Sequence, residues 1–586
     1  MDSVSVLEAL LSSLFRLVAF IFLRVIPSPL ARLALPALFV PYITTALLAP
    51  KKVPPQSPPR DRPSDHNEDP LRTILLSLPA RSRRLRGANL LINILLALAA
   101  VEFIATPFLD TAADLAYSRI GAVSSDIHQR LQPVENGPAL TFTQDADWVH
   151  TVKLAGLWPN TSYEYALSTP NRTLTSGPFS FHTFPDSRLS AGSHFRFVVS
   201  SCITPNFPYV PFQGRTIKGF DLLARYLFPD TAPAEPVPPA EFLLFLGDFI
   251  YADVPTYIGD NKEAYRRLYR RNYQSKSFKK VYERLPILHT YDDHEIKNNF
   301  AGNGNDSTPP FPSASDAFKI YNADANYDSL ADRHYYSFRY GDAAFFVLDT
   351  RRYRSGATED APIPTMLGET QLAALHSWLA HANGTASFKF IVSSVPFTSL
   401  WGHDAVIDSW AGFLAEKSAL LDALHSVPNV IILSGDRHEF ASIEFNSPTM
   451  HTVREYSTSP LSMFDIPFWR TLRMKSDETV EQNRSELVMT EEGPEYVTKV
   501  EQVPKERVVK YVARGNVKWS AFEMDTRDLE RPILRLELVI DGKIKYREEL
   551  IGSPIKLQSS NALGVFVSSG IKDVFNRIGI KPSRWF

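Results

Sequence analysis

Apolar residues along the chain follow two patterns, one of long unbroken stretches and one of short runs that alternate with helical patterns. The long stretches lie within the first 110 residues, at 4–23, 33–48 and 88–109. Spanning a bilayer takes about 20 apolar residues, so 88–109 is predicted to be a transmembrane helix. Arg16 would be costly at mid-bilayer, which leaves the first two stretches open between two further spans and an interfacial helix or a cleaved signal.

A polar, proline-rich segment at 51–87 separates the second stretch from the third. It carries nine lysine or arginine residues, and by the positive-inside rule it is cytosolic, so that the third helix exits on the opposite side. Five acceptor motifs for N-glycosylation occur, all after the third stretch. They are at Asn160, Asn171, Asn305, Asn383 and Asn483. We therefore expect an integral membrane glycoprotein whose large domain is lumenal or extracellular, with residues 1–110 as the membrane region.

Short alternating strands are predicted in the next region, 120–186. Residues 148–157 and 163–167 have strand patterns on either side of a proline-containing turn, and 177–183 has a third. A tyrosine after such a turn ties a corner in immunoglobulin-like domains. This region is predicted to be a small fibronectin- or immunoglobulin-like β-sandwich that acts as a spacer.

From 194 to 555 the pattern changes to buried strands that alternate with helices, which is typical of an α/β domain. The predicted strands are 195–200, 242–246, 286–291, 344–348, 388–395 and 429–433, and the predicted helices are 219–227, 262–282, 368–382 and 414–424. The C-terminal tail, 556–586, mixes basic and apolar residues. We expect it to be a helix packed on the domain rather than a segment that contacts the membrane.

Composition narrows the class of protein. With 44% hydrophobic and 22% charged residues, the 586-residue chain is not disordered throughout, collagenous or a coiled coil. Its 62 basic and 64 acidic residues leave a net charge of −2, so no nucleic-acid-binding surface is indicated. The chain has one cysteine, Cys202, which excludes an internal disulfide and leaves a free residue, a metal ligand or a nucleophile.

Potential metal ligands follow nearly every predicted strand of the α/β domain. Because sites in open α/β sheets gather outside the carboxyl ends of the strands, this recurrence predicts a shared site. The clusters are Ser200-Ser201-Cys202, Gly247-Asp248-Phe249-Ile250-Tyr251, Tyr291-Asp292-Asp293-His294-Glu295, Asp349-Thr350-Arg351-Arg352-Tyr353-Arg354 and Ser434-Gly435-Asp436-Arg437-His438.

The chemistry of these side chains points to a pair of cations. One carboxylate, that of Asp248, can bridge two ions about 3.5–4 Å apart. The phenol of Tyr251 has an ordinary pKa of about 10 and ionises at neutral pH only beside a strong Lewis acid, which favours ferric iron. Asp436 and His438 are alternate residues of an extended chain, so their side chains point to one side and can bind together.

The two remaining clusters suggest a cation and an anion. The mutual repulsion within Asp292-Asp293-His294-Glu295 calls for a cation or for a buried hydrogen-bond network. Arg351 and Arg354 could hold a phosphate through bidentate hydrogen bonds. A salt-bridged surface loop is the alternative for these arginines.

In this order, the five clusters resemble those of the PhoD-like alkaline phosphatase family, within the metallophosphoesterase (calcineurin-like) superfamily. The resemblance covers most of residues 120–555. It implies an α/β fold in which a four-layered α/β/β/α metallophosphoesterase domain (194–555) follows the small β-sandwich and the transmembrane helices. Cys202 stands where the wider superfamily has an Asp-x-His pair, a departure that belongs to the PhoD-like branch.

The resemblance also implies a binuclear or trinuclear site that holds Fe3+ and Ca2+, in preference to zinc or manganese. The iron ligands it implies are Cys202, Asp248, Tyr251 and His438. For calcium it implies Asp436 and one of Asp293, Asn298 and Asn299, among which the choice stays open. Arg351 or Arg354 would orient the phosphate.

The predicted function is that of a membrane-anchored, metal-dependent phosphoric ester hydrolase acting as a phosphomonoesterase, a phosphodiesterase or both. His294 would donate a proton to the leaving group or only orient a ligand. The alternative is a non-catalytic membrane glycoprotein that uses the fold as an interaction module, although degenerate members typically lose ligands and all five clusters are present here. A third reading keeps the enzyme and makes the substrate a lipid or GPI-type phosphodiester.

Overall fold

The protein is described by a computed structural model, which covers most of the chain. The described residues are 3–48, 69–78, 83–109, 143–154, 156–168, 174–186, 192–230, 237–327, 333–356, 364–448, 451–465, 470–490 and 493–554. The chain forms two compact units. One contains residues 1–113 with the loops 206–214 and 252–258, and the other contains the rest. The predicted tail helix at 556–586 lies outside the described residues.

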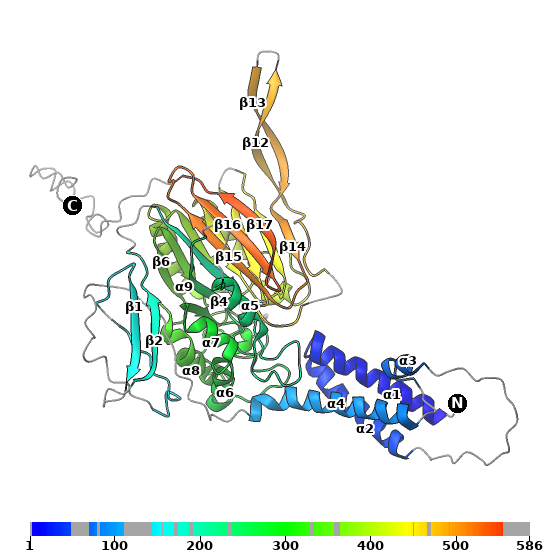
Figure 1. Ribbon diagram of the computed structural model, residues 1–586. Coiled ribbons are helices and arrows are strands. Elements are labelled where there is room, and N and C mark those ends of the chain that lie inside the picture. Colours follow the sequence, from blue (N-terminus) through cyan, green and yellow to red (C-terminus); the bar gives the residue numbers. More distant parts are fainter. Residues whose placement is uncertain are drawn as a thin grey trace, which may run out of the picture. The chain divides into compact units, whose positions relative to one another are not determined.

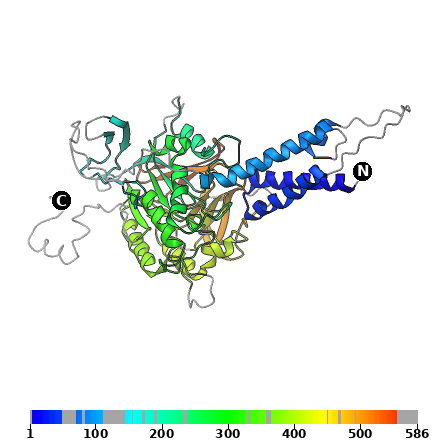
Figure 2. The same ribbon diagram turned by 90° about the horizontal axis from the view of Figure 1, so that it is seen from below.

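The first unit is helical. Its elements are α1 (Ser3–Phe20), a π-helical turn η1 (Ile21–Val25), α2 (Pro29–Leu48), α3 (Pro70–Leu75) and α4 (Arg83–Leu109). Both views show α1, α2 and α4 side by side (Figure 1, Figure 2). Among the described residues, three stretches are long and apolar enough to cross a membrane: Val6–Val25, Pro29–Leu47 and Arg84–Phe108. All three predicted stretches are therefore helices of spanning length.

Arg16, whose charge counted against a first span, has several partners inside this unit. Its Nε atom donates to Asn93 Oδ1 at 2.6 Å, and its Nη2 atom donates to Asn89 Oδ1 at 3.0 Å. Its Nη1 atom donates to the carbonyl of Ile74, in the short helix α3 that the hydropathy pattern did not predict. A paired guanidinium costs far less in an apolar environment than an isolated one. Arg16 is therefore compatible with α1 as a spanning helix.

Two mixed sheets form the larger unit. The first has the strand order β17-β16-β15-β3-β4-β5, in which β3, β4 and β5 are parallel neighbours. Its strands are β3 (His194–Ser200), β4 (Ala240–Leu246), β5 (Ile287–Thr290), β15 (Lys518–Asp525), β16 (Ile533–Ile540) and β17 (Lys543–Ile551). Predicted and observed ends of β3, β4 and β5 agree within two residues, because runs buried on both faces give a strong apolar signal.

The second sheet has the order β14-β10-β11-β9-β8-β7-β6, with β7, β8, β9 and β11 parallel. Its strands are β6 (Tyr336–Tyr340), β7 (Ala343–Val347), β8 (Phe388–Val392), β9 (Val430–Ser434), β10 (Phe440–Phe445), β11 (Val453–Thr458) and β14 (Glu506–Val512). The two sheets share one core. Phe197 of β3 meets Phe345 of β7 and Phe390 of β8 edge to face, with ring centroids 5.4 and 5.2 Å apart.

Among the described residues of this unit, α-helices form at the four predicted places, 219–227, 262–282, 368–382 and 414–424, and two further α-helices, 311–321 and 405–408, were not predicted. The helices are α5 (Lys218–Leu227), α6 (Lys262–Tyr273), α7 (Lys276–Tyr282), α8 (Phe311–Tyr321), α9 (Gly368–Asn383), α10 (Ala405–Asp408) and α11 (Leu414–His425). Phe220 of α5 stacks on Phe245 of β4, and Trp378 of α9 packs on Phe346 of β7. The single helix predicted at 262–282 is two helices, broken at Gln274–Ser275. The unit is thus a mixed α/β structure.

Two hairpins complete this unit. The pair β1 (Ser162–Ser168) and β2 (Leu174–His182) is antiparallel, and the Trp158 amide donates to the Tyr163 hydroxyl at 2.7 Å. The strand predicted at 148–157 is wrong for its described residues, which form a turn and irregular backbone. Much of the predicted sandwich, including 120–142, lies outside the described residues. The second hairpin, β12 (Thr479–Thr490) with β13 (Gly493–Pro504), projects from the sheets in Figure 1.

Candidate metal centre

Strand ends of both sheets converge on one buried cluster. Cys202, Asp248 and Asp292 each lie two residues beyond the ends of the parallel neighbours β3, β4 and β5, whose carboxyl ends share an edge. Asp436 lies two residues beyond β9 of the other sheet. The topology therefore brings together residues that are up to 234 positions apart.

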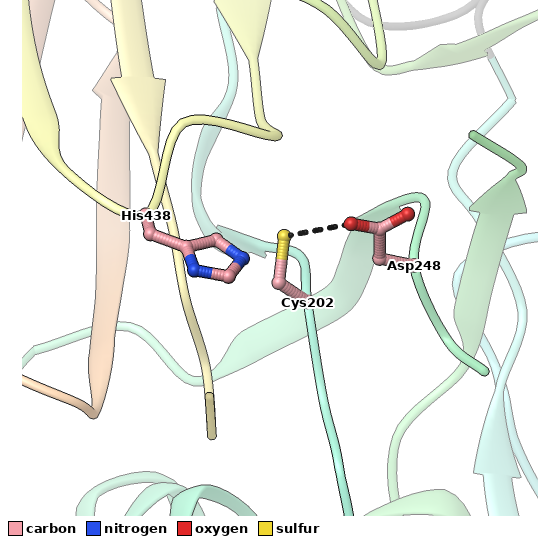
Figure 3. Close-up of side chains that lie close together, drawn as sticks. All are labelled: Cys202, Asp248 and His438. Atoms are coloured by element: carbon pink, nitrogen blue, oxygen red, sulfur yellow. Dashed lines mark hydrogen bonds between the residues drawn. The ribbon is translucent and has the colours of Figure 1, made fainter. Parts of the chain in front are cut away.

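The thiol, the phenol and the imidazole surround a single carboxylate. Cys202 Sγ lies 3.3 Å from Asp248 Oδ2 (Figure 3). The Tyr251 hydroxyl lies 2.9 Å from the same oxygen. The hydroxyl also lies 3.1 Å from His438 Nε2. One ligand atom each from Cys202, Asp248 and His438 fall within 4.8 Å of one another. The structure thus assembles the four residues that the resemblance implies as iron ligands.

Asp248 also belongs to two other groups of this kind. One consists of Asp248, Asp292, Asp293 and Asp436, and the other of Asp248, Asp293 and His294, again with ligand atoms within 4.8 Å of one another. Among the described residues, Asp248 is the member common to all three groups. A carboxylate that faces three sets of donors has the position that a bridging ligand needs.

The three residues left open for calcium are placed differently. The Asp293 carboxylate joins the cluster, while Asn299 contacts it through its backbone amide, which donates to Asp293 Oδ2 at 2.6 Å. Asn298 immediately precedes Asn299 in the same segment. The choice among the three residues stays a prediction.

The electrostatics of the cluster call for positive charge. Burial raises the pKa of Asp248 well above its usual range, and the neighbouring Asp293 and Asp292 raise it further, against an opposing effect of His294. Burial likewise raises the pKa of Asp436, Tyr251 and Cys202. Oδ1 of Asp248 and Oδ2 of Asp292 and of Asp436 are buried and accept no hydrogen bond from any described residue. These oxygens, with a thiol, a phenol and an imidazole, fit a pair of cations.

The backbone at the cluster has an uncommon conformation. Cys202, Asp248, Asp436 and His438 have φ angles of 61°, 56°, 70° and 58°, where an L-residue costs about 1–3 kcal/mol unless its surroundings compensate. Gly247 (φ 96°) is required at the end of β4, because a Cβ atom there would lie 2.6 Å from Asp292 Cβ. Backbone strain of this kind is typical of functional sites, where it holds side chains in the orientation that the site requires.

Glu295 organises the turn that carries Asp248. Its buried carboxylate accepts backbone hydrogen bonds from Asp248 at 3.0 Å, Phe249 at 2.5 Å, Ile250 at 3.3 Å and Asp292 at 2.7 Å. Burial raises the pKa of Glu295 to about 8, although the backbone donors oppose that shift. The sequence marked Glu295 only as one charge in an acidic run, and this positioning contact was missed.

Lys518 is a second positioning residue that the sequence did not reveal. It lies on β15, is fully buried, and its Nζ atom donates to the carbonyl of His438 at 2.9 Å. Nothing in the local pattern around Lys518 marks this contact, because its partner is 80 positions away.

Arg351 and Arg354 lie beside the cluster but are held by other carboxylates. Arg351 is fully buried and contacts Asp408 through both terminal nitrogens, at 2.7 and 3.1 Å, and Asp292 through Nε at 2.5 Å. Arg354 Nη2 lies 2.8 Å from Asp408 Oδ1. The surface-loop alternative is therefore wrong, and Asp408 is a partner that the sequence analysis missed. The structure describes no free guanidinium face on Arg351 for a phosphate.

Comparisons with known proteins point to one family. Residues 230–502 match PhoD, the PhoD-like phosphatase family. Alkaline phosphatase D of Bacillus subtilis (strain 168) is 26% identical over 247 residues, a match that covers 34% of this chain and 41% of the relative. The chain thus spans less than half the length of that relative.

Solved structures with weaker similarity include phosphatases. A PhoD structure covers 68% of this chain and 75% of its own, with 19% identity and a TM-score of 0.45. The match to the purple acid phosphatase PPD1 of yellow lupin (Lupinus luteus) seeds covers 67% of this chain and 60% of PPD1, with 13% identity and a TM-score of 0.42. The segment 230–502, which holds every proposed ligand except Cys202, is thus similar to the PhoD-like phosphatase family.

Proposed function

We propose that this protein is a membrane-anchored, metal-dependent phosphoric ester hydrolase. The observation that carries the proposal is the sharing of the Asp248 carboxylate among three buried groups of potential metal ligands. The match of residues 230–502 to the PhoD-like phosphatase family supports the same activity. Substrates are phosphomonoesters, phosphodiesters or both.

The donor types suggest which ions the centre holds. Cys202, Tyr251, His438 and Asp248 would hold ferric iron, because thiolate and phenolate are ligands for a strong Lewis acid. Asp293 and Asp436, with Asp248 as the bridge, offer only oxygen atoms, which calcium prefers. When bound, such a pair supplies a nucleophile at neutral pH and neutralises charge on the phosphoryl oxygens.

Residues of the chain itself position the reactants and move the proton. The His294 ring lies over the Tyr251 ring, with centroids 4.3 Å apart, and its imidazole belongs to the group with Asp248 and Asp293. In this proposal His294 gives its proton to the leaving oxygen. Arg351 holds Asp292 and Asp408 in place. The phosphate-orienting role predicted for Arg351 or Arg354 stays a prediction, which would require either residue to exchange its contact with Asp408.

The finer architecture and the sidedness are part of the same proposal. The aromatic contacts between the two sheets and the packing of α5 and α9 on them support a four-layered α/β/β/α domain. The basic linker at 51–87 supports a cytosolic position for that segment and a lumenal or extracellular catalytic domain. Three of the acceptor asparagines, Asn160, Asn305 and Asn383, are described and exposed, as a glycoprotein requires.

The test combines a metal analysis with a spectrum and an assay. The purified full-length protein should contain iron and calcium, hydrolyse p-nitrophenyl phosphate or its bis ester, and show a visible charge-transfer band that disappears in Tyr251→Phe. If the active protein were colourless and contained zinc, the assignment of iron would be wrong, and the proposed hydrolase function would still stand. Metal-free protein without turnover on either ester would favour the non-catalytic membrane glycoprotein.

A further inference from the structure

Two loops that begin at the metal centre belong to the helical unit. Loop 206–214 starts four residues after Cys202, and loop 252–258 starts immediately after Tyr251. By their contacts, both loops form one compact unit with α1, α2 and α4, the helices of spanning length. The two segments that carry the thiol and the phenol therefore continue directly into chain held by these helices.

Tyr209 fixes the first loop to two helices. Its amide donates to the carbonyl of Leu23 at 2.8 Å, and its own carbonyl accepts from Arg24 Nη1 at 2.8 Å. Its hydroxyl donates to Glu102 Oε2 of α4 at 2.6 Å. The rings of Phe207 and Tyr209 also pack on Phe103 of α4, with centroids 6.3 and 6.2 Å apart. The loop is thus held by hydrogen bonds and by ring packing.

The second loop is fixed by a side-chain contact. Arg32 Nη1, in the first turn of α2, donates to Thr256 Oγ1 at 2.5 Å. Leu23 lies near the end of the first apolar helix and Glu102 lies in the last third of α4, so every one of these contacts is at the same end of the helices. The basic linker, 51–87, joins the opposite ends.

Both loops present aromatic side chains to their surroundings. Phe212 is 97% exposed and Tyr257 is 45% exposed. Loop 206–214 (Asn-Phe-Pro-Tyr-Val-Pro-Phe-Gln-Gly) contains no charged residue. Aromatic residues are enriched where a membrane helix meets the headgroup region, and Phe212 and Tyr257 lie on loops that form one unit with helices of spanning length. The occupant that these loops fit is the lipid–water interface around the helices.

The covalent chain limits how far the metal ligands can be from that interface. A chain extends at most about 3.6 Å per residue. The five residues from Tyr251 to Thr256 therefore span at most about 18 Å, and the seven from Cys202 to Tyr209 at most about 25 Å. These are upper limits for a fully extended chain, so the two metal ligands lie within these distances of residues that the helices hold.

We propose that the substrate is the phosphate ester of a membrane amphiphile, presented to the metal centre from the bilayer surface by loops 206–214 and 252–258. This inference rests on the proposed hydrolase function. For a phosphomonoester lipid, the oxygen of water forms the new bond to phosphorus and the bond from phosphorus to the lipid oxygen breaks. One proton of the water passes to the lipid alkoxide, which yields an alcohol in the membrane and inorganic phosphate in solution.

The activity test uses two substrates that share the same reacting group. Full-length protein in phosphatidylcholine vesicles is assayed on phosphatidic acid in those vesicles and on glycerol phosphate in solution. We expect kcat/KM to be at least tenfold higher for phosphatidic acid. Phe212→Ser should lower that value at least tenfold and leave glycerol phosphate turnover unchanged, whereas the control Ile551→Ser, at a 53% exposed position on β17, should change neither.

A second measurement reports the position of the loop without any turnover. The native cysteine is fully buried, so Phe212→Cys and Ile551→Cys each introduce one accessible thiol for an environment-sensitive fluorophore. In vesicles that contain nitroxide-labelled phosphatidylcholine, the fluorophore at position 212 should be quenched, and the one at position 551 should not.

The outcomes separate this inference from the hydrolase proposal. Absence of turnover on every ester would overturn the hydrolase function, whatever the quenching result. Equal kcat/KM for phosphatidic acid and glycerol phosphate, with no effect of Phe212→Ser and no quenching at position 212, would overturn only the lipid-surface inference.

Discussion

Two clusters of buried polar side chains, one in each unit, differ in whether the protein alone satisfies them. In the helical unit, Arg16 donates to Asn93, Asn89 and the Ile74 carbonyl, and Asn93 donates to Ser12. One cation is thus surrounded by neutral acceptors. A network of this kind stabilises helix packing and needs no ligand.

The cluster at the strand ends has the opposite balance. Four aspartates lie with ligand atoms within 4.8 Å of one another, and three of them have a buried oxygen that accepts no hydrogen bond from the described residues. Arg351 offsets part of this charge through Asp292 and Asp293, and Arg437 does so through Asp436. A buried excess of carboxylates that the protein neutralises only in part indicates a cation, whereas a buried polar network by itself does not.

Replacing Asp248 by asparagine should have the largest effect. The substitution removes the carboxylate common to all three ligand groups, so we expect a loss of about 10³-fold or more in kcat/KM, as for the loss of a central electrostatic group. Metal content, measured by elemental analysis, should fall as well. Asp477→Asn, at a fully exposed side chain, is the matched control. Full turnover in Asp248→Asn would contradict the proposed centre.

Glu295→Gln should have the next largest effect. The amide keeps the size of the side chain but places an NH2 group where the carboxylate accepts backbone hydrogens, so the turn that carries Asp248 should lose its alignment. Loss of such a supporting contact typically costs 10–100-fold in metal affinity, which titration of the metal-depleted protein measures. Glu283→Gln, a residue paired with Lys279, should keep the affinity of the wild type. If Glu295→Gln also keeps the metal affinity of the wild type, Glu295 does not position the turn that carries Asp248.

Arg16→Met should affect the helical unit alone. It leaves the oxygens of Asn89, Asn93 and Ile74 without this donor, at about 1–3 kcal/mol for a buried unsatisfied group. Thermal unfolding in detergent should show a lower midpoint, while metal content and turnover per folded molecule stay unchanged. The exposed Arg72 of α3 gives the control Arg72→Met. A loss of metal in Arg16→Met would mean that the two clusters are not independent.

Lys389→Met should have the smallest effect. Lys389 is a buried cation whose Nζ atom donates to the Pro428 carbonyl at 3.1 Å, and burial, followed by repulsion from Arg339, lowers its pKa from 10.5 to about 7. Between these values the unfolded chain binds more protons than the folded one, so Lys389 makes the free energy of unfolding rise with pH across this window. Below about pH 7 the buried Lys389 is charged, which lowers the free energy of unfolding. Methionine at this position carries no charge and avoids that loss.

We therefore expect Lys389→Met to be more stable than the wild type by about 1 kcal/mol near pH 7, with a weaker pH dependence above it. Urea unfolding at about pH 6 and about pH 9 measures both quantities. The control is Lys262→Met, at a largely exposed side chain. Equal pH slopes for Lys389→Met and wild type would show that Lys389 does not titrate in this range.

The sequence predicted the strands of the sheet core well and some peripheral elements poorly. Runs such as those of β4 and β9 are apolar on both faces, so hydrophobicity alone locates them. The strand predicted at 148–157 does not form in its described residues, because alternation predicts a strand only where a partner supplies hydrogen bonds. The helix α3 is only six residues long, too short for a periodic signal.

The residues of the candidate site likewise fall into those that the sequence predicted and those that it did not. Cys202, Asp248 and His438 could be proposed because each directly follows a strand, and parallel strands align their carboxyl ends. Glu295, Lys518 and Asp408 could not, because their roles depend on backbone groups or side chains far along the chain. The pairing of Arg351 with Asp408 also escaped prediction, since sequence does not say which carboxylate a buried arginine meets.

Local pattern in the sequence thus determined which segments are apolar helices, which are buried strands, and which donor types follow the strands. These properties depend on residues that are near one another in the chain, as hydrophobic periodicity does. Only the tertiary structure decided that Asp248 is shared by three groups, that Arg16 has partners, and that two loops from the metal centre join the helices. Each of these depends on contacts between distant segments, whose geometry the folded chain alone defines.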